Sequence, residues 1–581
     1  MKREADELDG AVDAENGGPF RHSGSSHWSS EEADSSDLET HEQSPNPASA
    51  DCQKDEDEEA VFYIIFFYYR LVCIYLRLTK RERGRGQSLQ RKCFIPCTEN
   101  SFSERLAPLT ADFPPDISNI DVRFLTSFRL PGHSAKEVKD IAELYLKLGE
   151  TDWSGGALSG GVYNFDKEVN DLITQVYGMT AWTNPLHPDV FPGIRKMEAE
   201  IVQMGADMFH GGPGTCGTMT SGGTESLLLA CKAYRDYARE KKGIKWPEIV
   251  CAVSAHAAID KAAHYFRMRL VRVPVDPVTQ KADVNAMKKA ITRNTCMLIA
   301  SAPGFPHGVM DPISEIAALG RKYDIPVHVD ACLGGFVIAF MEEAGFTIPP
   351  FDFRVDGVTS ISVDTHKYGY APKGTSIILY SNPEYRHHQF FVAPNWTGGI
   401  YATPTISGSR PGALIATCWA ALMYYGRDGY VKATKRLCET HRFIEQGLRN
   451  INGIQVMGHP EACVVAIQSS EFNIYKLSDG MSRRGWSLNP LQFPFSIHIC
   501  VTYLHTHEGV AERFLNDIQE AVTEILENPS EDAGGSAAIY GMSQSIPDRS
   551  MVSDICSIFL DTLYNLDSAP KTKESDHLHQ E

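Results

Sequence analysis

The residues best suited to do chemistry are Asp364-Thr365-His366-Lys367, which follow a short apolar run. That run, residues 358–363, alternates valine, isoleucine and serine in a way that is typical of a buried strand. Ligands of α/β sheets bind beyond the carboxyl ends of the strands, so a ligand is expected beside Lys367. We expect a buried lysine with a lowered pKa, because a neutral amine can form a Schiff base with an aldehyde.

Three upstream features distinguish Lys367 from an ordinary surface lysine. A Gly-Gly-Thr turn at 222–224 opens directly into a helical run, and free N–H groups at a helix N-terminus bind anions. Asp330 ends an apolar run, Ile-Pro-Val-His-Val-Asp, and His256 follows another. Each feature alone has an ordinary explanation: the glycines could form a simple turn, Asp330 could cap a helix, and His256 could be a buried hydrogen-bonded histidine. Together they indicate a shared cleft.

The elements that must position these residues alternate in the manner of a parallel sheet. Strands are expected at 249–254, 271–275, 296–300, 326–329 and 358–363, and helices at 227–234, 259–266, 282–292 and 312–323. After Gly412 a smaller α/β set follows, with helices at 414–425, 430–449 and 508–527 and strands near 463–468 and 496–502. This alternation predicts an α/β layer architecture with a second, smaller C-terminal α/β domain.

The segment before the sheet has its own signals. Ser134 and Glu137 have the spacing of a capping box, which predicts a helix over 135–148. A second helix is expected at 194–207. Between them, Asn184 to Gly193 contains three prolines and is predicted to be irregular.

The net charge of −19 lies mostly in the N-terminal leader. Residues 1–59 contain 18 Asp and Glu against four Lys and Arg, and this composition predicts disorder. The rest is nearly balanced, so no nucleic-acid partner is expected. The fourteen cysteines include no set with zinc-like spacing, so we expect reduced cytosolic thiols and no metal site.

Residues 60–78 are dense in aromatic and aliphatic side chains and have the length of a transmembrane helix. Arg70 interrupts them, so a buried or interfacial helix is the alternative. Acidic residues precede the segment and six basic residues follow it at 80–92, which predicts a luminal N-terminus and a cytosolic catalytic portion by the positive-inside rule.

Six motifs, in this order and at these separations, resemble the sphingosine-1-phosphate lyase family within the fold-type-I, group II pyridoxal-phosphate enzymes. They are Asn-Pro-Leu-His-Pro-Asp (184–189), Thr-Ser-Gly-Gly-Thr-Glu-Ser (220–226), Ser-Ala-His-Ala-Ala (254–258), His-Val-Asp-Ala-Cys-Leu-Gly-Gly (328–335), Asp-Thr-His-Lys-Tyr-Gly-Tyr-Ala-Pro-Lys-Gly (364–374) and Gly-Ser-Arg-Pro-Gly (408–412). The resemblance covers roughly 150 to 560. Before that, only the family's arrangement of a luminal end, one span and a basic linker recurs.

The resemblance implies roles for individual residues. Lys367 would bind pyridoxal 5'-phosphate covalently, Asp330 would pair with the pyridine nitrogen to keep it protonated, and His256 would stack on the ring. The cofactor phosphate would be held by Gly223 and Thr224, helped by His366. Tyr163, Asn184 and His187 lie in stretches that reach the substrate, in part from the other subunit of a homodimer.

The resemblance also implies the reaction and the place where it occurs. The substrate would be sphingosine 1-phosphate or a related phosphorylated sphingoid base, whose C2–C3 bond breaks in a retro-aldol step to give a long-chain aldehyde and phosphoethanolamine. The enzyme would be a single-pass protein of the endoplasmic reticulum membrane. The residue that removes the proton of the 3-hydroxyl is left open between Tyr163 and Lys373.

Two alternatives belong to other classes. A group II amino-acid decarboxylase shares the His-Lys and Asp elements, and Arg410 would then bind a substrate carboxylate. A membrane-tethered scaffold with an inactive cleft is the second alternative, but no key position is missing.

The domain boundaries that we expect rest on the composition and periodicity of the chain and on the family resemblance. From the N-terminus they are a disordered leader (1–59), a transmembrane helix (60–78), a basic linker (79–133), an N-terminal segment that contributes to the active site and the dimer (134–220), a cofactor-binding large domain (221–412), a small domain (413–565) and a disordered tail (566–581).

Overall fold

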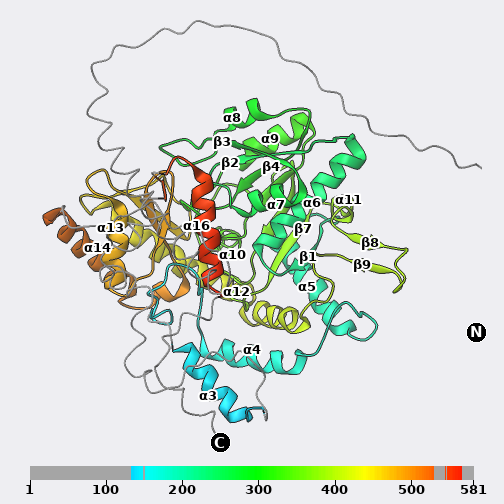
Figure 1. Ribbon diagram of the computed structural model, residues 1–581, viewed down its shortest axis with the longest axis horizontal. Coiled ribbons are helices and arrows are strands. Elements are labelled where there is room, and N and C mark those ends of the chain that lie inside the picture. The colour runs from blue at the N-terminus through cyan, green and yellow to red at the C-terminus, as the bar shows by residue number, and fades with distance from the viewer. Residues whose placement is uncertain (1–131, 148–150, 529–542, 545, 565–581) are drawn as a thin grey trace, which may run out of the picture. The chain divides into compact units, whose positions relative to one another are not determined.

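The computed structural model describes residues 132–147, 151–528, 543–544 and 546–564 (Figure 1). Its main sheet has seven strands, which are β1 (Cys216–Thr220), β2 (Glu248–Ala252), β3 (Arg269–Val273), β4 (Thr295–Ser301), β5 (Val327–Asp330), β6 (Val358–Val363) and β7 (Ser376–Tyr380). Their order is β1-β7-β6-β5-β4-β2-β3, and β7 alone runs antiparallel to its neighbours. The carboxyl ends of β1, β5 and β6 therefore meet at one edge of the sheet, as an α/β ligand site requires.

Helices cover both faces of this sheet, because successive side chains along a strand point to opposite faces and join two separate apolar clusters. On β2, Ile249 and Cys251 pack with α6 (Gly223–Lys242) and α7 (Ala258–Phe266). Val250 and Ala252, which point to the opposite face, join the larger cluster that includes α5 (Pro192–Met208) and α9 (Ile313–Tyr323). The sheet is thus the middle of three layers. Two short helices, α8 (Val284–Ala290) and α10 (Gly335–Ile338), lie in connections between strands.

A second, four-stranded antiparallel sheet forms the C-terminal part. Its order is β10 (Gln455–Val456), β11 (Val464–Gln468), β13 (Ser496–Cys500) and β12 (Asn489–Leu491). It packs with α13 (Ile474–Arg483) and the long α12 (Gly412–Arg449), and α14 (Val510–Glu527) packs on these two helices and on a 3-10 turn, η2, that spans Tyr503–Thr506. Helix α12 is interrupted at Gly426, whose φ of 55° suits glycine. A last helix, α16, spans Arg549–Thr562.

The expected α/β architecture is confirmed, with a mixed rather than wholly parallel sheet. Helix α3 (Ala135–Leu146) begins at the predicted capping box of Ser134 and Glu137. The elements that were not predicted include β1, β7, α4 (Lys167–Thr180), α11 (Pro383–His387), α13, α16 and the hairpin of β8 (Phe391–Ala393) and β9 (Tyr401–Thr403). The strands among them are short, with three to five residues each, and α4, α13 and α16 lie in segments to which no element was assigned.

Several predictions fall outside the described residues. They are the leader at 1–59, the span at 60–78, nearly all of the linker at 79–133 and the tail at 566–581. Within the part that the structure describes, no helix combines the length and the apolar character needed to cross a membrane.

Candidate active site

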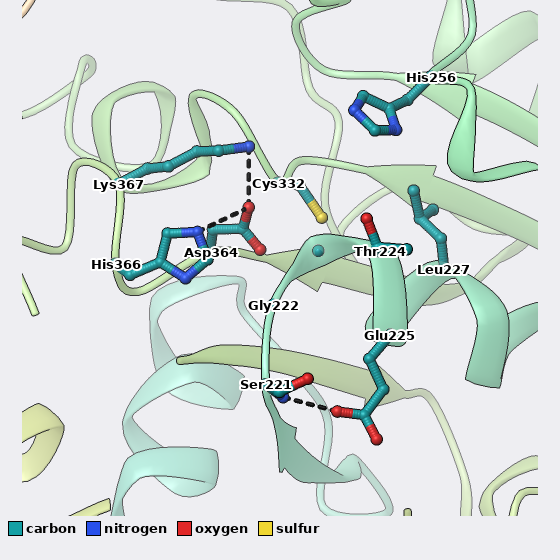
Figure 2. Close-up of a pocket in the computed structure, with 11 residues that line it drawn as sticks. Ser221, Gly222, Thr224, Glu225, Leu227, His256, Cys332, Asp364, His366 and Lys367 are labelled. Carbon is teal, nitrogen blue, oxygen red and sulfur yellow. Dashed lines mark hydrogen bonds and ion pairs between the residues drawn. The ribbon is translucent and has the colours of Figure 1, made fainter. Parts of the chain in front are cut away.

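A cavity of about 300 Å³ lies where β1 and β6 end, and it contains most of the chemistry-bearing motifs (Figure 2). Its lining residues are Ser221, Gly222, Gly223, Thr224, Glu225, Leu227, His256, Cys332, Asp364, His366 and Lys367. Figure 2 shows Lys367 and His256 on opposite sides of this cavity. Segments that are more than a hundred residues apart in sequence therefore form one site.

The glycine turn between β1 and α6 forms the floor of the cavity. Helix α6 begins at Gly223, so its first backbone N–H groups have no helical partner. A Cβ atom at Gly223 would lie 2.8 Å and 2.9 Å from the two Asp364 carboxylate oxygens and 3.0 Å from the Cys332 sulfur. Only glycine fits at this position. The close approach leaves a bare backbone cradle at a helix N-terminus, which suits a phosphate group.

Lys367 does not have the lowered pKa that we expected. Burial alone would lower it, but the Asp364 carboxylate, 2.8 Å from Nζ, raises the pKa of Lys367 above its ordinary value. The pair is well shielded from solvent, with the Asp364 side chain 2% exposed and that of Lys367 21% exposed. The neutral amine that the sequence suggested is an ammonium in this arrangement, because Asp364, Cys332 and Asp330 together outweigh desolvation.

His366 is oriented by the backbone beside this pair. Its Nδ1 accepts a hydrogen bond from the Thr375 N–H at 3.3 Å, which leaves the proton on Nε2. Nε2 lies 3.6 Å from the Asp364 carboxylate. Burial lowers the pKa of His366, so the ring is neutral at pH 7 and its N–H points toward the cavity side of Asp364.

Asp330 and His256 have different relations to the cavity. Asp330 ends β5 and is buried, and its carboxylate accepts a hydrogen bond from the Cys332 N–H at 3.0 Å. It does not form part of the cavity wall. His256 does, and its Nδ1 accepts a hydrogen bond from the Ala258 N–H at 3.1 Å. The other ring nitrogen and one ring face remain available to a ligand.

Tyr163 and Lys373 lie near Lys367 but outside the cavity wall. The buried Tyr163 ring contacts that of Tyr368 edge-on at 4.8 Å, and the Lys373 amine lies 4.6 Å from the centre of the Tyr163 ring. Partial burial, with the charge of Lys367, lowers the pKa of Lys373 to about 8. Burial raises the pKa of Tyr163 well above its ordinary value. Of these two residues, Lys373 is the one that loses a proton more readily.

Asn184 and His187 do not line the cavity within one chain. The Asn184 amide donates to Ser409 Oγ at 3.1 Å, and its oxygen accepts the Arg410 N–H at 3.2 Å. His187 is exposed. The structure therefore does not bring either residue together with Lys367 inside a single chain.

Arg410 is not free to bind a substrate carboxylate. Its guanidinium donates two hydrogen bonds to the buried Glu198, one of them at 2.9 Å, and Arg195 binds the same carboxylate at 2.6 Å. Breaking this pair would leave Glu198 buried without its main partner, which is costly. The role given to Arg410 in the decarboxylase alternative is therefore wrong for this arrangement.

Two residues of this region, Cys332 and Glu198, were given no role from the sequence, and Asp364 was named there without one. Asp364 precedes Lys367 by three positions, so its closeness to the lysine could be read locally. Cys332 lies two positions after Asp330. Glu198 carried no signal, because its partner Arg410 is 212 positions away.

Comparison with known proteins defines the class. A family model described as the pyridoxal-dependent decarboxylase conserved domain matches residues 159–469. The fold is similar to that of a glutamate decarboxylase from Lactobacillus brevis, with a TM-score of 0.60, 20% identity, and coverage of 70% of this chain and 96% of that one. The fold and the site together define a pyridoxal-phosphate-dependent enzyme with a decarboxylase-like α/β fold.

Two other proteins give a finer assignment. A solved sphingosine-1-phosphate lyase from Burkholderia pseudomallei has a TM-score of 0.70 and 36% identity, covering 77% of this chain and 99% of that one, and sphingosine-1-phosphate lyase 1 of Rattus norvegicus is 52% identical over 87% of this chain and 88% of its own length. The chain belongs to the sphingosine-1-phosphate lyase family. The family resemblance drawn from the motifs is confirmed.

The cavity fits pyridoxal phosphate by two observations. The bare cradle at Gly222 and Gly223 offers backbone N–H groups to a phosphate, and Lys367 extends into the same cavity, with its amine on Asp364 next to this cradle. One oxygen of the buried Asp364 has no hydrogen-bond partner among the described residues. A polar ligand in the cavity would supply the partner that this oxygen lacks.

Proposed function

We propose that the chain is a pyridoxal-phosphate-dependent lyase that cleaves the C2–C3 bond of sphingosine 1-phosphate and related phosphorylated sphingoid bases. The products are a long-chain aldehyde and phosphoethanolamine. The observation that carries the proposal is the cavity in which Lys367 faces a phosphate cradle, in a chain of this family. The pairing of Arg410 with Glu198 favours the lyase over an amino-acid decarboxylase, since it removes the expected carboxylate-binding group.

Each protein group has a task in this reaction. Bound pyridoxal phosphate supplies an electron sink for the electrons of the broken C–C bond. Gly223, Thr224 and His366 would hold its phosphate, Asp330 would keep its ring nitrogen protonated, and His256 would contact its ring. Lys367 would be the residue that binds the cofactor covalently.

Lys373 is the better candidate for the base that takes the proton of the 3-hydroxyl. An amine with a pKa of about 8 is neutral in part at pH 7 to 8, whereas the buried Tyr163 phenol holds its proton more tightly than usual. Tyr163 then has the task of positioning Lys373, whose amine lies over its ring.

Product analysis tests the function against both alternatives. The purified protein is incubated with sphingosine 1-phosphate, and we expect equal amounts of long-chain aldehyde and phosphoethanolamine. Release of carbon dioxide from amino acids, with no aldehyde from the lipid, would instead support a decarboxylase. A colourless protein that does not take up pyridoxal phosphate would support the inactive scaffold.

We further propose a homodimer in which each cavity is completed by its partner. Asn184 and His187 do not reach Lys367 within one chain, and large apolar side chains are exposed nearby in sequence and on the β8–β9 hairpin. Trp182 is 94% exposed, Met179 82% and Ile400 81%. Exposed apolar side chains of this size are typical of an interface between subunits.

Complementation between two inactive chains tests this arrangement. Lys367→Ala and His187→Ala chains are each expected to be inactive as homodimers. In a mixed dimer one cavity carries both defects and the other carries neither, so we expect activity to return toward a quarter of the wild-type value, since half of the molecules are mixed dimers and each has one intact cavity of two. Heterodimers verified by two affinity tags that remain inactive would contradict a shared cavity.

We propose that residues 60–78 anchor the enzyme in the endoplasmic reticulum membrane, with residue 1 in the lumen. The apolar run and the basic residues at 80–92 support this orientation. Deletion of residues 1–92 is expected to release a soluble protein that still takes up pyridoxal phosphate and cleaves the lipid. Loss of cofactor binding in the truncated chain would mean that this segment belongs to the catalytic core.

A further inference from the structure

The carboxylate that is paired with Lys367 belongs to Asp364. Asp364 Oδ2 lies 2.8 Å from Nζ and is the main group that opposes the effect of burial. Cys332 and Asp330 face Lys367 from the end of β5, and both act in the same direction at longer range. His366, Lys373 and Cys500 are the other titratable groups that couple with Lys367, from the residue before it, the loop after it and β13.

Asp364 is built into the floor of the cavity and cannot move away. Its backbone N–H donates to the Cys332 carbonyl at 3.4 Å, and Gly223 packs directly against both carboxylate oxygens. One oxygen binds Lys367, and the other has no partner among the described residues although it is fully buried. A buried carboxylate in this position needs a cation, and Lys367 is the cation nearest to it.

We infer that Asp364 is the positioning residue of Lys367: its carboxylate holds the lysine as an ammonium whenever the lysine is not bonded to the cofactor. Two consequences follow for the enzyme. The lysine that the substrate has displaced stays charged and aimed into the cavity, so it does not attack the cofactor again before the C–C bond has broken. Capture of the cofactor requires that a proton first move from Nζ.

The capture reaction balances in protons and charge. Overall, the Lys367 nitrogen gains a double bond to the aldehyde carbon of the cofactor, and the aldehyde oxygen leaves as water with two protons, equal in number to two of the three ammonium protons. The third proton and the positive charge stay on the nitrogen. The first proton that Nζ loses, which frees the attacking electron pair, passes to water, and the leaving oxygen takes one proton back from water.

This inference rests on the proposed function only through the cofactor, and it can be tested without substrate. The full chain is freed of cofactor, pyridoxal phosphate is added, and the rate of covalent capture is followed by absorbance between pH 6 and 10. In the wild type we expect the rate to rise through pH 9 without levelling off. In Asp364→Asn the midpoint is expected to fall by about two pH units, so capture at pH 7 accelerates about a hundredfold, since below the midpoint the neutral fraction changes tenfold per pH unit.

Two further variants separate positioning from mere structural support. Asp364→Glu keeps the carboxylate and is expected to keep the wild-type pH profile. Asp352→Asn removes another buried carboxylate, one that binds His210 and Arg354 away from the cavity, and it is expected to leave the profile unchanged. Equal midpoints in wild type and Asp364→Asn would overturn the inference.

Failure of the inference can be distinguished from failure of the proposed function. If Asp364→Asn does not fold, the wild-type profile decides, because a rate that levels off below pH 9 would show that the lysine is not held as an ammonium. If the wild-type chain captures no cofactor at all, the proposed function itself fails. Capture at a normal rate with an unshifted profile leaves the function intact and rejects the role of Asp364 alone.

Discussion

Lys367→Ala is expected to lower turnover by at least about a thousandfold, since the covalent exchange at this residue has no substitute in the cavity. Within the cavity wall, Lys367 provides the only primary amine of the described residues. The variant is also expected to lose the absorbance that borohydride removes from a lysine-bound cofactor. Formation of long-chain aldehyde from sphingosine 1-phosphate measures the first effect, and the visible spectrum before and after reduction measures the second.

A matched variant tests whether a loss of folding stability, and not the loss of the amine, explains the loss of turnover. Removing the ammonium leaves the Asp364 carboxylate buried and unpaired, which typically costs about 3 to 5 kcal/mol of folding stability. The double variant Lys367→Ala, Asp364→Asn removes this unpaired charge and is expected to recover most of the stability without any recovery of turnover. Activity above a few per cent of wild type in either variant would contradict the assignment of Lys367.

The second large effect is a steep loss of stability in mild acid. Four buried histidines, His307, His328, His498 and His505, each have a pKa that burial lowers to about 4. Three of them have a ring nitrogen without a partner among the described residues. If that nitrogen took up a proton, the new N–H group would have no hydrogen-bond acceptor. In the unfolded chain these rings titrate near their ordinary pKa of about 6.5.

The sign of the effect follows from proton binding. Below pH 6.5 the unfolded chain takes up protons that the folded chain refuses until about pH 4, so folding stability falls through this window. Each histidine contributes about 1.4 kcal/mol per pH unit, and four of them cost about 5 kcal/mol between pH 7.5 and 5.5. Burial raises the pKa of Asp311 to about 6, and this group offsets about 1 kcal/mol because it binds its proton more readily when folded.

Denaturant unfolding at pH 7.5 and 5.5 measures this difference. A loss of about 5 kcal/mol is comparable with the whole stability of many domains, so the unfolding midpoint is expected to fall sharply. His328→Gln removes one of the four groups and keeps a polar side chain between the hydroxyls of Ser360 and Ser362. It is expected to reduce the loss by about a quarter, whereas His459→Gln, at an exposed position, leaves it unchanged. An equal loss in all three proteins would refute the explanation.

Much of the fold and part of the site were readable from the sequence because the signals are local. The capping box at Ser134 and Glu137, and the strands at 296–300 and 358–363, depend on neighbours within a few positions, and the structure has them. The order of Gly-Gly-Thr, His256, Asp330 and Lys367 predicted the cofactor, because each residue type serves one part of its chemistry. Of these, Asp330 alone lies outside the cavity wall.

The tertiary structure decided what depends on packing between remote segments. Asp364 lies only three positions before Lys367, but it is the packing of the remote Gly223 against its carboxylate that buries the pair, and the pKa of Lys367 is raised and not lowered because electrostatic effects follow distance and burial rather than residue type. Arg410 was a plausible carboxylate ligand until Glu198, 212 positions away, was found bound to it. Residue types and short spacings therefore determined which chemistry this chain can perform, and packing between distant segments decided the charge of each group that performs it.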